Sequence, residues 1–407
     1  MPTRSYFFPP DFSHLEEILR AEPEGLPDDL QNYFRGKSIP PIPSEAALPR
    51  FLGISPKTIF SIRRNKEKHY RVFGITKRDG TRREIQTPRT YLKVIQWWLL
   101  DNILDNAKVA DNVFGFVAGR SAIKNAQYHY GANHILNVDI QHFFPSITQA
   151  QVVSVFEEIG YGKDVSRYLA ELCCFRERVP QGAPTSPAIA NLVLAALDKE
   201  LTIIAENANC RYSRYADDLS FSSTELIDAR FLNEITNAVA QAGFTLKKTK
   251  TRFAGKGERM EVTGVVINEV IQPTRDWRKK VRAKLHRLSA ISRLVRADVN
   301  FLYGIRGMAA QFPESPQMTA LASKAEELCR SRAHTVIGHG PNPLLPNGLT
   351  LSQAEVLANL RPRNTNYDIA IKLGSSEAVI KKRLQEAFRK IGSADRTQAE
   401  RWAKENL

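Results

Sequence analysis

Cysteine is scarce in this sequence. The chain has four cysteines in 407 residues, and although Cys173 and Cys174 are adjacent, no pair has the Cys-x-x-Cys spacing. This pattern argues against a disulfide framework and against a cysteine-based zinc site. It is typical of a protein that works in a reducing compartment, so we expect a cytoplasmic location.

Long apolar runs are also missing. The longest run, residues 188–197, is interrupted by Asn191 and is too short to span a bilayer. Residues 1–10 contain no apolar core of the length that a secretory signal needs. We therefore expect neither export nor a membrane partner.

Acidic residues are outnumbered by basic ones. The chain has 58 lysines and arginines against 43 aspartates and glutamates, a formal net charge of +15. This balance favours a polyanionic partner, with nucleic acid ahead of a membrane surface, because aromatic and basic residues recur along the whole chain. A basic protein with no such partner is the alternative. The length allows roughly two to three domains.

The most informative stretch is Tyr215-Ala216-Asp217-Asp218. The alternation of apolar and polar residues over 219–222 predicts a strand, and 211–215 a second one, so that the two aspartates lie at the connecting hairpin. Adjacent carboxylates repel each other unless a cation lies between them. Oxygen ligands without histidine or cysteine suit Mg²⁺ better than zinc. For this motif alone, a solvated acidic turn is an equal alternative.

A second acidic position follows a buried type of strand. Residues 134–139 are mostly apolar and end in Asp139, which Phe143 and Phe144 follow closely. A carboxylate at the end of an apolar strand needs a cation or a strong hydrogen-bond donor, because burying it unpaired is costly. Asp139 is therefore a candidate third metal ligand.

A polar loop rich in glycine and proline, residues 179–187, opens an apolar helix predicted over 188–201. A loop that enters a helix N-terminus presents free N–H groups and the positive end of the helix dipole. By itself the loop is explained as a turn and a helix cap. Together with the acidic positions it predicts a nucleotide-positioning floor, with Gln181 and Gly182 against base and sugar.

Basic residues gather on a predicted hairpin nearer the N-terminus. Residues 70–88 are expected to form two strands around a turn at 78–80, and Lys77, Arg82 and Arg83 flank that turn. They are either solvated strand edges or a clamp on the triphosphate of a nucleotide. In the second case Lys77 is a point charge and Arg83 a bidentate fork.

The remaining N-terminal segments carry less information. Residues 1–50 are rich in proline, with a helix expected after Ser13, and no function can be assigned to them. A further helix is expected over 91–106, and a glycine pair within 114–120 indicates close approach of two backbone segments.

In type and in order, the acidic strand, the Gln181-Gly182 loop and the aspartate hairpin resemble the palm of a reverse transcriptase. Residues 125–129 resemble the NAxxH signature, and residues 262–264 the VTG signature, of the retron branch of bacterial reverse transcriptases. The resemblance covers residues 48 to 332. It implies an α+β fold, a right-hand polymerase with fingers (51–135), a palm (136–270) and a helical thumb (271–333).

The resemblance implies an RNA-directed DNA polymerase of retron type. Such an enzyme copies a structured non-coding RNA, primed from a 2′-hydroxyl of that RNA, into a branched RNA-linked single-stranded DNA, and serves antiviral defence. Its partners are that RNA, the cDNA and dNTPs. Two alternatives stay open at this point: a group II intron-like or abortive-infection reverse transcriptase, and a DNA-binding transcriptional regulator with an inert palm.

The resemblance also implies roles for individual residues. Two Mg²⁺ ions would be held by the three carboxylates Asp139, Asp217 and Asp218, and Phe144 would exclude a 2′-hydroxyl. The dNTP would be contacted by Lys77, Arg83, Phe144, Gln181, Gly182 and Lys250. Nucleic acid would be contacted by Asn125, His129 and Thr263. One departure is Lys247, which stands where relatives often have asparagine.

A basic amphipathic helix is expected after the palm. One face carries Trp277, Val281, Leu285, Leu288 and Ile291, and basic residues occupy the rest. Such helices are often simply solvated. After a polymerase palm, the basic face is better interpreted as a thumb that lies along the phosphates of a template–product duplex. The contacts would come from Arg278, Lys279, Arg282 and Arg287.

A second module is expected after a linker at 334–348 rich in glycine and proline. Residues 349–407 predict four helices in a helix-turn-helix layout. The stretch 349–403 resembles a LuxR-type DNA-binding domain, which would place Lys381, Lys382 and Arg383 of the third helix near nucleic acid. Val379 and Arg383 depart from the residues common there, so a protein-interaction module of the same fold is the alternative. The resemblance implies a homodimer, and an effector protein or DNA as the partner of this module.

Overall fold

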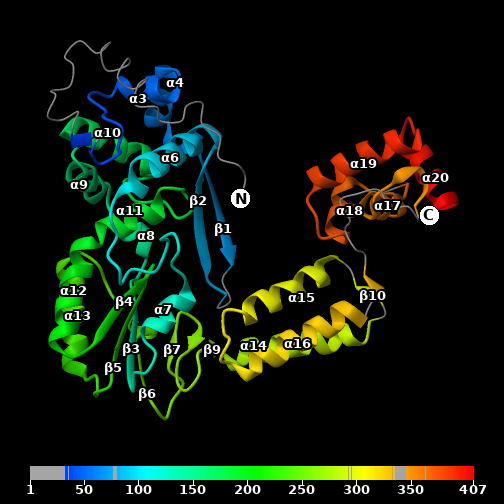
Figure 1. Cartoon of the computed structure of the whole chain (residues 1–407). Helices are drawn as coiled ribbons and strands as arrows, with labels where there is room; N and C mark the ends of the chain where they lie inside the picture. The colour runs from blue at the N-terminus through cyan, green and yellow to red at the C-terminus, as the bar shows by residue number, and fades with distance from the viewer. Residues whose placement is uncertain are drawn as a thin grey trace. The chain divides into compact units, whose positions relative to one another are not determined.

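The computed structural model describes residues 33–34, 36–76, 80–291, 293–294, 296–331, 333–334, 345–362 and 364–407. The chain divides into two compact units, Met1–Glu269 and Val270–Leu407 (Figure 1). The helix expected after Ser13, the residue Lys77 and most of the linker at 334–348 lie outside the described residues. Among the described helices, none is long and apolar enough to cross a membrane.

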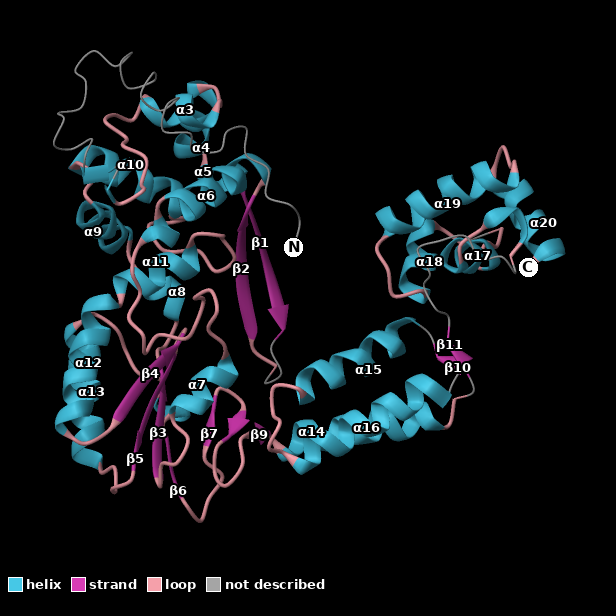
Figure 2. Ribbon diagram, viewed as in Figure 1, coloured by secondary structure: helices cyan, strands magenta, loops and turns pink. Residues whose placement is uncertain are grey.

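A four-stranded antiparallel sheet forms the centre of the first unit (Figure 2). Its order is β4 (Arg211–Tyr215), β5 (Asp218–Ser223), β3 (His134–Asp139), β6 (Arg252–Gly255). The strands over 134–139, 211–215 and 219–222 are therefore confirmed. The register aligns Val138 with Leu219 and Asp139 with Asp218. Because the paired apolar side chains are buried, a slip by one residue would move them to the opposite face, and this fixes which carboxylates meet.

Helices share one hydrophobic core with the sheet. They are α8 (Phe143–Ser146), α9 (Gln149–Ile159), α10 (Lys163–Cys173), α11 (Ser186–Val193), α12 (Ala195–Asn207) and α13 (Ala229–Gln241). Fully buried side chains such as Phe156, Leu169 and Phe221 belong to one hydrophobic core. The single helix predicted over 188–201 is wrong, because α11 and α12 are separate and meet at Leu194, whose ψ of −1° departs from helical geometry.

Short helices and one hairpin precede the sheet. They are α3 (Ala47–Leu52), α4 (Pro56–Arg64), α5 (Lys66–His69), β1 (Tyr70–Thr76), β2 (Arg82–Pro88), α6 (Thr90–Asn102) and η1 (Leu104–Asn106). The two strands predicted over 70–88 are present, and their antiparallel register runs from Tyr70↔Pro88 to Thr76↔Arg82. The helix predicted over 91–106 is shorter than expected, because α6 ends at Asn102 and a 3₁₀ turn follows.

A small helix and a second hairpin complete the surroundings of the sheet. Helix α7 (Ala122–Tyr128) packs against β7 (Glu261–Val262) and β8 (Val265–Val266). The turn between these strands contains Thr263 with a positive φ of 48°, and its hydroxyl donates to the carbonyl of Ala122 at 2.9 Å. The short helix η2 (Lys248–Lys250) lies beside β3.

The second unit contains two sets of helices. The first set comprises β9 (Gln272–Pro273), α14 (Arg275–Ser289), β10 (Arg293–Leu294), α15 (Arg296–Ala309), α16 (Pro316–Ser331) and β11 (Ala333–His334). Helices α14 and α15 both pack against α16. On the predicted apolar face Val281, Leu285 and Leu288 are buried, whereas Ile291 follows the end of α14 and is exposed.

The last helices have a hydrophobic core of their own. They are η3 (Pro346–Gly348), α17 (Leu351–Ala358), α18 (Asn366–Lys372), α19 (Glu377–Ile391) and α20 (Arg396–Asn406). Their core includes Val356, Ile369, Ile380 and Leu384. Thr350 and Thr365 begin α17 and α18 with reciprocal capping boxes, which fix helix starts that the sequence placed nearby.

Candidate active site

Three carboxylates converge at one end of the central sheet. Asp139 ends β3, Asp218 begins β5 directly opposite, and Asp217 occupies the turn between β4 and β5. One oxygen atom of each lies within 4.8 Å of the others. The amide of Ile140 donates to the carbonyl of Asp217 at 2.9 Å, which fixes the turn against the end of β3. The sheet register and this hydrogen bond together hold the three carboxylates close to one another.

The hairpin turn needs an unusual backbone conformation. Ala216 has φ of 59°, in the left-handed region that non-glycine residues seldom occupy. The amide of Phe114 donates to the carbonyl of Arg214 at 2.7 Å, so that the preceding loop runs along β4. A Cβ atom at Gly115 would overlap the amide nitrogen of Ala216. The close approach expected from the glycine pair therefore occurs at Gly115, against the turn that carries Asp217.

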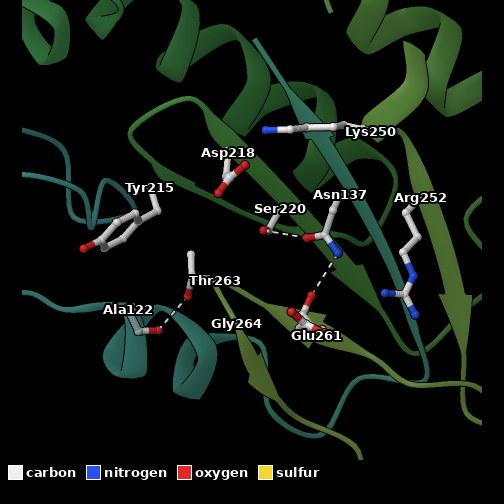
Figure 3. A pocket seen from close by; sticks show the side chains of 10 residues that line it. All are labelled: Ala122, Asn137, Tyr215, Asp218, Ser220, Lys250, Arg252, Glu261, Thr263 and Gly264. Atoms are coloured by element: carbon white, nitrogen blue, oxygen red, sulfur yellow. Dashed lines mark hydrogen bonds between the residues drawn. The ribbon is translucent and has the colours of Figure 1, made fainter. Parts of the chain in front are cut away.

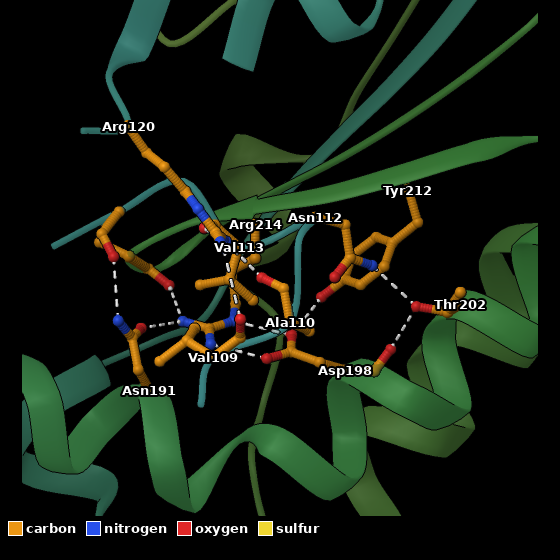
Figure 4. A network of polar contacts seen from close by, with 12 residues as sticks. Val109, Ala110, Asn112, Val113, Arg120, Asn191, Asp198, Thr202, Tyr212 and Arg214 are labelled. Atoms are coloured by element: carbon orange, nitrogen blue, oxygen red, sulfur yellow. Dashed lines mark hydrogen bonds and ion pairs between the residues drawn. The ribbon is translucent and has the colours of Figure 1, made fainter. Parts of the chain in front are cut away.

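A buried ion pair holds the end of the strand that leads into this turn (Figure 4). Arg214 donates to the two carboxylate oxygens of Asp198 at 2.8 and 2.7 Å, and both side chains are almost completely inaccessible to solvent. The phenol of Tyr212 donates to the same carboxylate at 2.7 Å. Arg214 also donates to Asn191 at 2.9 Å and to the carbonyl of Ala216 at 3.3 Å. Burial opposes the charged guanidinium, but its bonds with Asp198 outweigh this and raise the pKa of Arg214.

A cleft of about 590 Å³ opens beside the carboxylates. Its lining includes Arg83, Phe144, Gln181 and Lys250, four of the six residues expected to contact a nucleotide, together with Asp139 and Asp217. Gly182 follows the lining residue Gln181, whose carbonyl accepts a hydrogen bond from the amide of Gln86 at 2.8 Å. A Cβ atom at Gly182 would lie 3.0 Å from Ile85. The sixth residue, Lys77, lies outside the described residues.

Several cleft residues were not among the six expected nucleotide contacts. They include Phe116, Lys247, which the sequence marked only as a departure from relatives, and Arg82, which it marked only as one of the basic residues at the hairpin turn. Phe116 packs against Phe144 with ring centroids 6.1 Å apart, and Phe143 lies 5.1 Å from Phe144, so the aromatic floor of the cleft has three rings rather than one. The sequence signal for Phe116 was its place between the paired glycines.

Lys250 has a more specific place than expected. Its ammonium forms an ion pair with the carboxylate of Asp139. Burial works against the charge of Lys250, but the bond with Asp139 and the other two carboxylates raise its pKa. Lys250 therefore neutralises part of the acidic cluster, and it also lines a second pocket of about 320 Å³ with Tyr215, Asp218 and Thr263 (Figure 3).

The cluster is electrostatically suited to a hard divalent cation. Burial, followed by the charges of Asp217 and Asp139, raises the pKa of Asp218 to about 7. Burial and Asp139 also raise the pKa of Asp217. All three ligand atoms are carboxylate oxygens, the donor type that Mg²⁺ prefers. The donor set and the clustered charge fit such an ion.

Asn125 and His129 do not fit the expectation that they contact nucleic acid. Both are fully buried, and the ring nitrogens of His129 lie 2.6 Å from the hydroxyl of Ser213 and 2.7 Å from that of Ser222. Ser213 in turn donates to Asn125 at 2.6 Å. Burial, and then the charge of Arg211, lower the pKa of His129 to about 3. Asn125 and His129 therefore connect α7 to both strands of the aspartate hairpin. The hydrogen-bond network that they form is buried and uncharged.

The other expected nucleic-acid residues lie at the surface of their own elements. Thr263 is half-buried and lines the smaller pocket. On α14, Lys279, Arg282 and Arg287 are exposed, while Arg278 is half-buried and donates to Gln272 at 2.5 Å. On α19, Lys381 and Lys382 are exposed and Arg383 is half-buried.

Carboxylates at the end of a strand and in the adjoining hairpin, facing a basic and aromatic cleft, define a nucleotidyl-transferring polymerase. The family model described as reverse transcriptase (RNA-dependent DNA polymerase) matches residues 75–267. The chain belongs to the retron reverse transcriptases and is an RNA-directed DNA polymerase.

Individual relatives support this assignment. The Retron Ec86 reverse transcriptase of Escherichia coli is 36% identical over 242 residues, which cover 58% of this chain and 75% of that protein. The Retron Mx162 reverse transcriptase of Myxococcus xanthus is 34% identical over 291 residues, covering 62% and 60%. Telomerase from Candida albicans overlaps in structure with a TM-score of 0.39 at 11% identity, covering 83% of this chain and 66% of that one, an overlap that carries no weight for function.

The buried ion pair yields a first prediction. Asp198→Asn should destabilise the protein by about 3–5 kcal/mol, because it leaves the guanidinium of Arg214 buried without its counterion. Chemical denaturation followed by circular dichroism measures the change. As a control, Asp111→Asn breaks the exposed ion pair with Arg120 and should leave the midpoint unchanged. Equal midpoints for both variants would contradict a structural role for the buried pair.

The carboxylate cluster yields a second prediction, on pH. The unfolded chain ionises Asp218 near its ordinary pKa of 3.8, whereas the folded chain holds the proton up to about 7, so stability falls as pH rises through this window. Asp218→Asn should therefore raise the melting temperature in EDTA by roughly 5 °C at pH 8 and by much less at pH 4. The exposed control Asp164→Asn should show no such pH-dependent gain. Added Mg²⁺ should stabilise the wild type more than Asp218→Asn.

Proposed function

We propose that this retron-type polymerase copies a structured non-coding RNA and leaves the DNA product joined to it through a 2′-hydroxyl branch. The observation that carries the proposal is the convergence of Asp139, Asp217 and Asp218 on the cleft that Arg83, Phe144 and Gln181 also line. In this proposal residues 51–135 act as fingers, 136–270 as palm and 271–333 as thumb. The cysteine pattern supports a cytoplasmic location.

The chain's own residues would bind and orient the reactants. Arg83 and Lys77 would hold the triphosphate, Gln181 and Gly182 would support base and sugar, and Phe144 would close the space that a 2′-hydroxyl needs. The primer hydroxyl attacks the α-phosphorus, a new phosphodiester bond forms and pyrophosphate leaves. Two Mg²⁺ ions bound by the three aspartates would lower the pKa of that hydroxyl and neutralise charge on pyrophosphate.

The C-terminal helices would give this enzyme a second interaction. We propose that α19 carries nucleic-acid contacts through Lys381 and Lys382, which are exposed on one basic helix, in a helix-turn-helix of LuxR type. Arg383 would add to this surface, and pairing through α20 would give a homodimer. An antiviral role, with this module recruiting an effector, is consistent with the polymerase family and belongs to the same proposal.

A third prediction tests the polymerase site. The double variant Asp217→Asn/Asp218→Asn should lose at least about a hundred-fold of cDNA yield with copurified RNA, Mg²⁺ and dNTPs, because the charged ligands are gone. Its RNA should still copurify, and Asp164→Asn should match the wild type. Undiminished cDNA from the double variant would refute the catalytic assignment.

The product of the same reaction distinguishes the polymerase types. DNA whose 5′ end is joined to a 2′-hydroxyl of RNA supports the branched retron product. DNA attached to protein favours an abortive-infection enzyme, and no retained product favours a group II intron-like one.

A fourth prediction concerns α19. Lys381→Ala/Lys382→Ala should weaken binding of a labelled duplex about ten-fold and reduce the salt dependence by about two phosphate contacts, while polymerase activity stays unchanged. Fluorescence anisotropy at several salt concentrations measures both. The matched control Lys163→Ala/Lys199→Ala removes the same charge from exposed positions of α10 and α12. Equal losses in both variants would indicate nonspecific attraction, and absence of duplex binding by the wild type would favour a protein partner.

A further inference from the structure

The cleft has two walls that carry positive charge. Arg82 and Arg83 of β2 form one of them. Lys247, which precedes η2, and Lys250, the last residue of η2, form a second wall next to Asp139. A nucleotide triphosphate placed at the carboxylates needs cations on its β- and γ-phosphates, because these oxygens carry most of the charge. The side chains of the second wall therefore determine whether the β- and γ-phosphates meet cations from one segment of the cleft or from two.

The backbone fixes the position of Lys247. Its amide donates to the carbonyl of Asp139 at 2.8 Å, and the amide of Gln141 donates to the carbonyl of Thr245 at 2.8 Å. Ile140 and Leu246 form an antiparallel bridge between these bonds. Opposite residues of an antiparallel pair project to the same face. The side chain of Lys247 therefore leaves the backbone beside the carboxylate of Asp139 and lines the cleft, where it is half-buried.

The two lysines of this wall are not equivalent. Lys250 is engaged by the carboxylate of Asp139. Lys247 has no side-chain hydrogen bond or ion pair within the described ranges of the chain. The acidic residue on the other wall, Glu84, accepts a hydrogen bond from Gln86 at 2.7 Å. An ammonium group held in a cleft without an internal partner is available to an anionic ligand.

We propose that Lys247 binds the terminal phosphates of the incoming deoxynucleoside triphosphate, together with Arg83 of the same cleft. This inference rests on the proposed nucleotide cleft and adds to it a binding residue from the palm side. The competing role is that of a second counterion for Asp139. A counterion would affect metal binding and leave the affinity for the triphosphate tail unchanged, so the two roles have different signatures.

The experiment compares two ligands on the full-length chain. Equilibrium binding of dTTP and dTMP is measured by calorimetry in Mg²⁺ for the wild type, Lys247→Met, Lys247→Arg and Lys248→Met. Lys248→Met is the matched control, because Lys248 is exposed, adjacent, carries the same charge and does not line the cleft. Thermal unfolding of each variant checks folding, and similar melting temperatures are expected since Lys247 has no internal partner to lose.

Lys247→Met should bind dTTP about ten-fold or more weakly, the effect of losing one charge-assisted hydrogen bond, and should bind dTMP like the wild type. Lys247→Arg should keep most of the affinity, and Lys248→Met all of it. In extension of oligo(dT) on poly(rA), KM for dTTP should rise in Lys247→Met with kcat changed less than about two-fold.

Two results would overturn the role of Lys247. The first is unchanged dTTP affinity in Lys247→Met, and the second is an equal loss for dTTP and dTMP. Both concern binding, so they differ from a failure of the polymerase assignment, which would appear as undiminished cDNA after Asp217→Asn/Asp218→Asn.

Discussion

The buried ion pair of Arg214 and Asp198 is the interaction on which the aspartate hairpin depends. It joins β4 to α12, and through its remaining donors Arg214 reaches Asn191 and the carbonyl of Ala216. Such a pair contributes little net stability by comparison with a packed apolar contact, because both charges lose their hydration. Its value here is geometric. It holds a left-handed residue at the one place where the backbone must turn between Tyr215 and Asp217.

That geometry has an electrostatic cost. Burial, and then the two carboxylates that lie within 4.8 Å, raise the pKa of Asp218 to about 7, and Lys250 relieves only part of the repulsion. The surrounding structure must offset this, and it does so with a rigid frame: a buried sheet, the uncharged His129 network and the loop that packs Gly115 against the turn. This frame holds the three carboxylates in a fixed arrangement before a cation binds. Such preorganised charge is what polymerase catalysis relies on.

Local sequence patterns predicted the strands and the acidic positions, because alternation and strand ends are local properties. They could not predict partners that lie far apart in the chain. The pairing of Asp139 with Lys247 joins segments more than a hundred residues apart, and nothing in either segment marks it. Likewise the NAxxH resemblance identified Asn125 and His129 but not their direction: both side chains are buried, where Ser213 hydrogen-bonds to both and Ser222 to His129. The strands followed from local patterns and the fold class from the family resemblance, whereas the inward or outward direction of a polar residue followed from packing.

The division into two units bears on how the polymerase and its C-terminal helices influence each other. The carboxylates, the cleft and its aromatic floor all belong to the first unit, while α17, α18, α19 and α20 have a separate core and their own helix caps. Coupling between sites requires a ligand or element that both of them bias. Exposed cations on α14 and on α19 make a polyanion the ligand class that suits both surfaces. The RNA template, or the DNA copied from it, is therefore the physical candidate for communication between polymerisation and the C-terminal module.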